Sequence, residues 1–245
     1  MAKRFGAGQC IHCQTYVDQL TSDHIFPESW YPDTTPLGLE KWQAPSCKSC
    51  NSEHGKIERR LLQQLGLGTD PWVSGAAGIG EKALRSFDPR VAKNDKDRKA
   101  RENARDKVAR ELQQMSQFPA GDVLPNIGTI QAGGGEGYAV TEVSAADIGR
   151  VVKKIVLGIT YLRTGQILPR KYRVAVLSPS ENAKLPESWL HTSRDVFVRP
   201  PGFLVHRHYV DDDEFAAFFS IFIWERYEFC AAIVNTELET RVAAG

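Results

Sequence analysis

Residues 10–13 read CIHC and residues 47–51 read CKSCN, so four cysteines form two pairs that each have two residues between their members. This spacing lets both sulfurs of a pair face one ion, and four thiolates in a tetrahedral array are the usual coordination of structural zinc. A unit of this size has too little apolar surface to fold on its core alone, so bound metal would supply much of its stability. The expected Zn²⁺ ligands are Cys10, Cys13, Cys47 and Cys50.

The composition indicates an ordinary globular protein. The chain has 245 residues, of which 42% are hydrophobic, 25% charged and 9% aromatic, which argues against wholesale disorder and leaves room for two modest domains. The formal net charge is +1. The chain as a whole therefore has no electrostatic signature for nucleic acid, and a phosphate-binding surface must come from local clusters of Lys and Arg.

The sequence shows neither a membrane segment nor a secretory signal. No apolar run reaches the roughly 20 residues that cross a bilayer, and the opening MAKRFGAGQC contains no apolar stretch. We therefore expect a cytoplasmic protein without a membrane partner. Because the cytosol keeps thiols reduced, this location favours a metal site over disulfides for the paired cysteines.

The hydrophobic pattern divides the chain into four parts. Residues 1–65 hold the cysteine pairs and then a helix, with apolar residues at helical spacing, a cap at Asn51 or Ser52 and an end at Gly66. Residues 66–80 are rich in glycine, which predicts a linker. The first two parts are thus a small zinc-stabilised unit and a flexible connection.

A basic helical arm is predicted over residues 81–118. Lys and Arg recur throughout this stretch, and acidic residues are interspersed between them. Two interpretations stay open. The arm is a solvated surface on which opposite charges pair, or it contacts the phosphates of a nucleic acid.

Residues 119–245 predict a C-terminal α+β domain with an antiparallel sheet. A helical pattern covers residues 145–162, and five short strand-like runs follow it. The runs are YRVAVL (172–177), DVFVR (195–199), GFLVHRHYV (202–210), FAAFFSIFIW (215–224) and FCAAIV (229–234). The fourth run is a core strand, and Cys230 in the fifth is a buried thiol. We expect this domain to select the target or to mediate dimerisation.

The segment between the cysteine pairs contains TSDHIFPESW at residues 21–30, with adjacent Asp and His ahead of a proline. The second pair runs directly into Asn51, and Lys56 follows after four further residues. In this order, C-x2-C, DHIFP and C-x2-CN-x4-K, the first quarter of the chain resembles the HNH endonuclease family. The resemblance implies a ββα-metal fold, in which a strand ends in Asp-His, a loop follows, and a helix begins just after the second knuckle.

The resemblance also implies the catalytic groups. Asp23 and Asn51 would supply oxygen ligands to a divalent ion, Mg²⁺ or Mn²⁺, distinct from the zinc. Charge that develops on the scissile phosphate would be neutralised there. His24 would be the general base that takes a proton from the attacking water, because imidazole titrates closest to neutral pH.

Several residues on the predicted helix have roles that the sequence leaves open. His54 lies three residues after Asn51 on the same helical face. Three interpretations of it stay open: a further metal ligand, a phosphate contact or a solvent-facing side chain. The basic side chains near it are suited to phosphate contact and equally to salt bridges with neighbouring glutamates. These basic residues are Lys56, Arg59 and Arg60, and the glutamates are Glu53 and Glu58.

The chain departs from the HNH pattern at one position. The middle Asn of that pattern, which orients the base histidine and lies several residues before the second cysteine pair, has no counterpart in LEKWQAPSC (39–47). Gln43 is the nearest amide in this segment. It is therefore the candidate to hold His24 in its productive tautomer.

The leading hypothesis is a metal-dependent endonuclease that hydrolyses phosphodiester bonds in DNA, by nicking or by cutting both strands as a homodimer. By the resemblance, its products would carry 5′ phosphate and 3′ hydroxyl ends. Two alternatives stay open. One is a noncatalytic zinc module that binds nucleic acid or a protein, since the middle Asn is absent. The other keeps the chemistry and makes RNA the substrate, as in a toxin or defence effector.

A second group of polar residues lies nearer the end of the chain. His206 and His208 alternate on one strand and precede Asp211, Asp212 and Asp213. A metal site is one interpretation of this group. A charged hairpin turn after a strand explains the same residues and is preferred.

Overall fold

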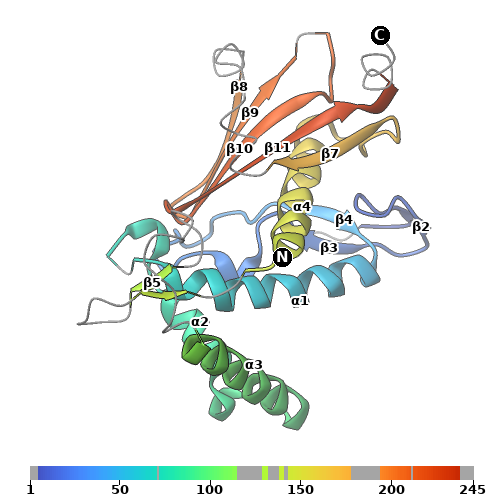
Figure 1. The fold of residues 1–245 in the computed structure, drawn as a ribbon. Helices are drawn as coiled ribbons and strands as arrows, with labels where there is room; N and C mark the ends of the chain where they lie inside the picture. Colours follow the sequence, from blue (N-terminus) through green and yellow to red (C-terminus); the bar gives the residue numbers. More distant parts are fainter. Residues whose placement is uncertain are drawn as a thin grey trace.

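The computed structural model describes residues 5–70, 72–114, 129–131, 138–140, 143–177, 194–210 and 212–237 (Figure 1). It combines helices with a five-stranded antiparallel sheet, which confirms the expected α+β class. Two sequence predictions fall outside the described residues, the end of the basic arm at 115–118 and the acidic residue Asp211. In the described part of the chain, no helix is long and apolar enough to cross a bilayer.

The N-terminal part forms two short antiparallel hairpins followed by a helix. Its elements are β1 (Gly8–Gln9), β2 (Tyr16–Val17), β3 (Thr21–His24), β4 (Gln43–Ser46) and α1 (Lys48–Leu65). β1 pairs with β2, so CIHC forms the turn of the first hairpin, and β3 pairs with β4. The connection between β3 and β4 contains a 3-10 turn at Glu28–Trp30. The second cysteine pair thus lies where β4 passes into α1.

Helix α1 begins earlier than the sequence indicates. Its N-cap is Cys47, whose sulfur accepts a hydrogen bond from the backbone N–H of Cys50 at 3.4 Å. The prediction of a cap at Asn51 or Ser52 is therefore wrong, because a sulfur takes the role usually played by a side-chain oxygen. The predicted end at Gly66 is confirmed. The apolar face is also confirmed, since Ile57, Leu61, Leu62 and Leu65 are all buried.

The basic stretch after α1 forms two helices. They are α2 (Ile79–Phe87) and α3 (Asp95–Gln114), and 3-10 turns at Gly66–Gly68, Ser74–Ala76 and Pro89–Val91 connect the elements around them. α2 buries Ile79, Ala83 and Phe87, whereas no residue of α3 between Asp95 and Arg110 is buried. α3 therefore presents charged side chains to solvent along most of its length.

The C-terminal part contains one long helix and the five-stranded sheet. The helix is α4 (Ala145–Thr164), and the strands are β7 (Tyr172–Leu177), β8 (Arg194–Arg199), β9 (Phe203–Tyr209), β10 (Ala217–Ile223) and β11 (Tyr227–Asn235). The strand order is β7-β11-β10-β9-β8, and every neighbouring pair is antiparallel. A further small pair joins β5 (Thr129–Gln131) to β6 (Tyr138–Val140). All five predicted strand runs and the predicted helix are confirmed.

One hydrophobic core joins the N-terminal and C-terminal parts. α4 lies between the sheet and α1 (Figure 1), and its buried apolar residues join the same cluster as Ile25 and Phe26 from the loop after β3. The indole N–H of Trp224 donates to the carbonyl of Trp30 at 2.7 Å, and the Tyr227 hydroxyl donates to the carbonyl of Leu65 at 2.7 Å. The division of the chain into separate domains stays a prediction, and the packing couples its first and last parts.

Gly158 on α4 provides a test of this packing. A Cβ atom at Gly158 would lie 2.8 Å from Cγ1 of Ile25, whereas a Cβ at Gly149 of the same helix meets nothing within 4 Å. We expect Gly158→Ala to lower the free energy of unfolding by about 1–3 kcal/mol, since well-packed cores resist added methyl groups. Gly149→Ala should instead raise it by about 0.5–1 kcal/mol through helix propensity. Urea unfolding measures both, and equal effects would contradict the close approach of α4 to the loop after β3.

Candidate metal centres

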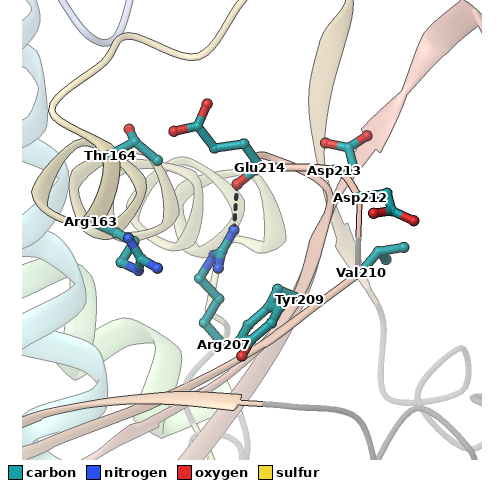
Figure 2. Close-up of a pocket in the computed structure, with 8 residues that line it drawn as sticks. All are labelled: Arg163, Thr164, Arg207, Tyr209, Val210, Asp212, Asp213 and Glu214. Carbon is teal, nitrogen blue, oxygen red and sulfur yellow. Dashed lines mark hydrogen bonds between the residues drawn. The ribbon is translucent and has the colours of Figure 1, made fainter.

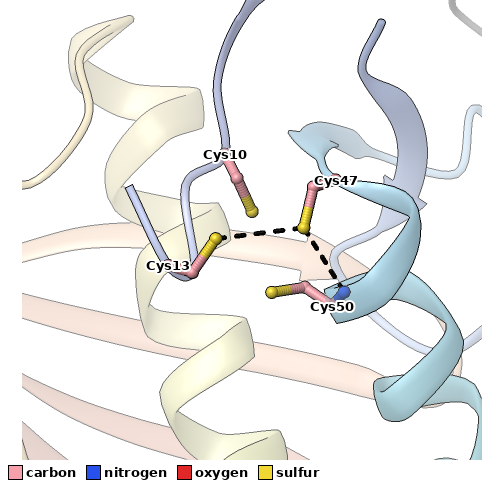
Figure 3. Close-up of side chains that lie close together, drawn as sticks. All are labelled: Cys10, Cys13, Cys47 and Cys50. Carbon is pink, nitrogen blue, oxygen red and sulfur yellow. Dashed lines mark hydrogen bonds between the residues drawn. The ribbon is translucent and has the colours of Figure 1, made fainter. Parts of the chain in front are cut away.

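Four cysteine side chains converge where the turn between β1 and β2 meets the start of α1 (Figure 3). The sulfurs of Cys13 and Cys47 are 3.9 Å apart, and all four sulfurs lie within 4.8 Å of one another. Cys10 and Cys47 are buried, whereas Cys13 is exposed. The prediction that the two pairs come together is confirmed, and the cluster could hold a metal ion such as zinc.

Backbone N–H groups point at the sulfurs of two of the four cysteines. The N–H of His12 donates to the sulfur of Cys10 at 3.4 Å, and the N–H of Cys50 donates to the sulfur of Cys47 at 3.4 Å. Partial burial raises the pKa of Cys13, but hydrogen bonds from Thr15 and the neighbouring cysteines outweigh it and lower that pKa to about 6. Thiolates are the form in which cysteine binds metal, so the donor set fits zinc.

A second cluster lies beside the cysteines and joins His12, Asp23 and His54. Oδ2 of Asp23 is 3.1 Å from Nε2 of His12 and 3.3 Å from Nδ1 of His54. The three ligand atoms lie within 4.8 Å of one another, and the centroids of the two imidazole rings are 4.3 Å apart. The structure therefore brings together Asp23 and His54, which the sequence singled out, and His12, which it did not.

The cysteine turn and α1 position this second cluster. His12 lies between Cys10 and Cys13, so the fold of the first knuckle fixes its direction. His54 lies four residues after Cys50, about one turn further along α1. In the sequence, the only indication for His12 was its place between the two cysteines of C-x2-C. Residues at such positions are normally taken as spacers without a role in metal binding.

Asp23 carries a buried negative charge that three cationic or polar groups stabilise. Its Oδ1 lies 2.8 Å from Nζ of Lys154 on α4, and both side chains are almost fully buried, at 5% and 2% exposed. Burial alone would raise the pKa of Asp23, but hydrogen bonds to His12 and His54 and the ammonium of Lys154 hold this pKa far below its usual range. Asp23 is therefore ionised at neutral pH, which is the form that binds a metal.

Lys154 also bonds to Glu58, so one ammonium bridges two carboxylates. Burial raises the pKa of Glu58, and the charge of Lys154 opposes that effect. Burial likewise lowers the pKa of His12, although its hydrogen bond to Asp23 works in the other direction. The cluster thus combines one anionic oxygen donor with an imidazole held in its neutral form.

His24 ends β3, directly after Asp23, and contacts the amide of Gln43. The two residues face each other in the β3–β4 register, and Nε2 of Gln43 lies 2.9 Å from Nε2 of His24. Burial lowers the pKa of His24, and the charge of Glu28 works against this shift. His24 is therefore a neutral imidazole at pH 7, and the Gln43 amide holds the ring through a hydrogen bond to Nε2.

Asn51 connects α1 to β3. Its amide nitrogen donates to Oγ1 of Thr21 at 3.1 Å and to the carbonyl of Ser22 at 3.1 Å. These bonds hold the first turn of α1 against the strand that carries Asp23. The expected role of Asn51 as an oxygen ligand stays a prediction.

The basic residues of α1 have different surroundings. Arg60 makes two hydrogen bonds to the carboxylate of Asp147 on α4, at 2.9 and 3.0 Å. Lys56 and Arg59 are exposed, and Arg59 reaches Asp97 only at 3.8 Å. The glutamates that the sequence offered as their partners bond elsewhere, because Glu53 pairs with Arg150 and Glu58 with Lys154. Exposed positive charge therefore remains at Lys56 and Arg59.

The acidic segment after β9 forms a hairpin turn beside a hollow of about 270 Å³ (Figure 2). The carboxylate of Asp213 accepts hydrogen bonds at 2.9 Å from the backbone N–H groups of Phe215 and Ala216 and from the Tyr172 hydroxyl. Arg207 crosses the hollow and donates to the carbonyl of Glu214 at 2.7 Å. In the described residues, the groups able to hold a metal include neither these acids nor His206 and His208, which supports the turn interpretation.

Comparisons of the chain with protein-family models, with curated proteins and with solved structures found no match. The geometry of the two clusters is thus the observation from which a function can be proposed.

Substitutions of two neighbouring lysines of α4 test the contact between Lys154 and Asp23. Lys154→Met leaves two buried carboxylates without their cation, so we expect the free energy of unfolding at neutral pH to fall by about 3–5 kcal/mol. Lys153 is exposed, so Lys153→Met should change it by less than about 0.5 kcal/mol. Chemical denaturation at pH 7 compares them, and a loss below about 1 kcal/mol for Lys154→Met would show that the buried contact contributes little.

Proposed function

We propose that the chain is a metal-dependent endonuclease of the HNH type, which hydrolyses phosphodiester bonds in DNA. The observation that carries this proposal is the convergence of His12, Asp23 and His54 beside the cysteine cluster, with the neutral His24 one residue away. A bound metal ion can stabilise charge on a scissile phosphate, and a neutral imidazole can take a proton from the attacking water.

The two clusters would hold different ions. Four thiolates form a closed set suited to structural Zn²⁺. Asp23, His12 and His54 offer one oxygen and two imidazole nitrogens, a set that suits Mn²⁺ better than Mg²⁺, which prefers oxygen ligands. An ion held by these three groups would supply positive charge to the scissile phosphate. Asn51 stays the additional oxygen ligand expected from the resemblance.

His24 would act as the general base. A base must be neutral, and burial favours that form. The Gln43 amide contacts Nε2 through its nitrogen in the structure, so Nδ1 would accept a proton from water only with this amide turned over. That role requires the ring proton on Nε2, which the Gln43 amide stabilises when its oxygen faces the ring. Gln43 would thus take the place of the missing middle Asn as a positioning residue.

One observation favours a second candidate, a noncatalytic zinc module that binds nucleic acid or a protein. Nζ of Lys154 lies 2.8 Å from Oδ1 of Asp23. This ammonium already neutralises a carboxylate that would otherwise attract a cation. In this candidate the cluster of His12, Asp23 and His54 is a structural network, and the cysteine cluster alone binds metal.

A plasmid assay tests the endonuclease. Wild-type protein should nick supercoiled DNA with Mn²⁺ or Mg²⁺ and should lose this activity in a chelator. His24→Ala should lower the rate by about 100- to 10,000-fold, the range of general-base contributions, while keeping its zinc and its circular dichroism spectrum. Cys47→Ala is the matched contrast, since it removes a zinc ligand and should unfold the N-terminal part.

Three results would argue against this assignment. Equal cleavage by wild type and His24→Ala would remove His24 from the chemistry. Equal loss of zinc in His24→Ala and Cys47→Ala would make His24 a structural residue. Wild-type protein that cleaves neither DNA nor RNA with either ion, yet binds DNA, would support the zinc module.

A further inference from the structure

A hollow of about 500 Å³ lies among α1, α2 and α3, and four of its ten lining residues are cationic. The hollow, here called the α1–α3 groove, has four cationic residues and one acidic residue, Glu58, in its lining. The cations are Arg59 of α1, Lys82 and Arg85 of α2, and Arg101 of α3. Because the whole chain has a net charge of only +1, this groove is a local concentration of positive charge.

The positive charge of the groove is only partly neutralised. Asp97 pairs with Arg101 at 3.1 Å, and Asp33 pairs with Lys82 at 2.7 Å. Glu58 is engaged by Lys154. Among the described residues Arg85 has no carboxylate within salt-bridge distance, and its side chain is exposed. Four cations thus face three carboxylates, Asp97, Asp33 and Glu58, of which Glu58 shares Lys154 with Asp23, and this leaves an excess of one positive charge.

Two of the groove cations are held in place by backbone carbonyls. Nη1 of Arg101 donates to the carbonyl of Arg85 at 2.7 Å, which ties α3 to the end of α2. Nζ of Lys82 donates to the carbonyl of Tyr31 at 2.6 Å. Ordered cations lose less conformational entropy when they bind an anion than free ones do. Two of the four cations of the groove therefore have fixed positions.

The groove and the cluster of His12, Asp23 and His54 share helix α1. Gly55, which follows His54 on α1, is part of its lining, as is Glu58. The Glu58 carboxylate bonds to Lys154, and Lys154 contacts Asp23. Glu58 in the lining is therefore connected through the buried Lys154 to Asp23, and the groove uses the same helix that carries His54.

We propose that the α1–α3 groove binds the sugar-phosphate backbone of a nucleic-acid strand and so guides an adjoining phosphodiester to the cluster beside His24. This inference rests on the proposed function, because the same strand is its substrate. Arginine is suited to this task, since its guanidinium donates two parallel hydrogen bonds to a phosphate. Contacts of this kind set affinity and position without reading sequence.

The test measures binding separately from cleavage. The 245-residue, zinc-loaded chain with His24→Ala is titrated into fluorescein-labelled 20-base-pair DNA, and in a second arm into RNA of the same sequence, without added Mn²⁺ or Mg²⁺. Kd is followed by anisotropy over a range of NaCl concentrations. Arg85→Glu is compared with Arg194→Glu, the same charge change at an exposed residue of β8, on the part of the molecule far from α3 (Figure 1). Circular dichroism and zinc content confirm that both variants fold.

We expect Arg85→Glu to weaken binding at least roughly tenfold, as for loss of a charged hydrogen bond, and to reduce the slope of log Kd against log salt by about 1. Arg85→Gln should show a smaller loss in the same direction, and Arg194→Glu should bind as the parent does. A difference in Kd between the DNA and RNA arms shows which nucleic acid the groove prefers.

Several results would overturn the inference. These are an unchanged Kd for Arg85→Glu, an equal loss in Arg194→Glu, or no binding of either nucleic acid by the parent chain. The outcome is independent of the nuclease test. Cleavage by wild type with a Kd insensitive to Arg85 rejects the groove alone, whereas groove-dependent binding without cleavage rejects the nuclease alone.

Discussion

The contact between the ammonium of Lys154 and the carboxylate of Asp23 is the interaction on which the candidate site depends. It joins residues 131 positions apart, at 2.8 Å and almost without solvent exposure. A buried carboxylate is costly unless cations and hydrogen bonds surround it, and Asp23 has one ammonium and two imidazoles. This requirement fixes α4 against β3 and α1. The first and last parts of the chain also share one hydrophobic core around this contact.

The same carboxylate separates the two functional interpretations. Oδ1 of Asp23 faces Lys154, whereas Oδ2 faces His12 and His54. If Oδ2 and the two imidazoles bind a divalent ion, Lys154 acts as a support that keeps Asp23 ionised and correctly oriented. If they do not, the network is a structural device that holds α4 in place. Under the first interpretation, the proposed role of the α1–α3 groove would give the substrate a path along α1, α2 and α3.

Much of the fold followed from local patterns, because the five strands and α4 carry clear hydrophobic periodicity. The cysteine cluster followed from spacing, and the amide beside His24 followed from the absent middle Asn, which left Gln43 as the nearest substitute. Two residues of the site could not be found this way. His12 is hidden inside a zinc knuckle, and Lys154 is one lysine in a helix, where solvent exposure is the ordinary expectation. Only tertiary packing shows that Lys154 is buried and Lys153 is not.

The central claim is that Asp23, His12 and His54 form a second metal site, separate from the cysteines. Its most direct test is a titration of zinc-loaded protein with Mn²⁺, in which electron paramagnetic resonance counts the free ion. The account predicts one bound Mn²⁺ per chain in the wild type and none in Asp23→Asn, which keeps the shape of the side chain and removes its charge. A wild type that binds no Mn²⁺, or an Asp23→Asn variant that binds it equally well, would contradict the account and leave the cysteine cluster as the one metal centre that the described residues support.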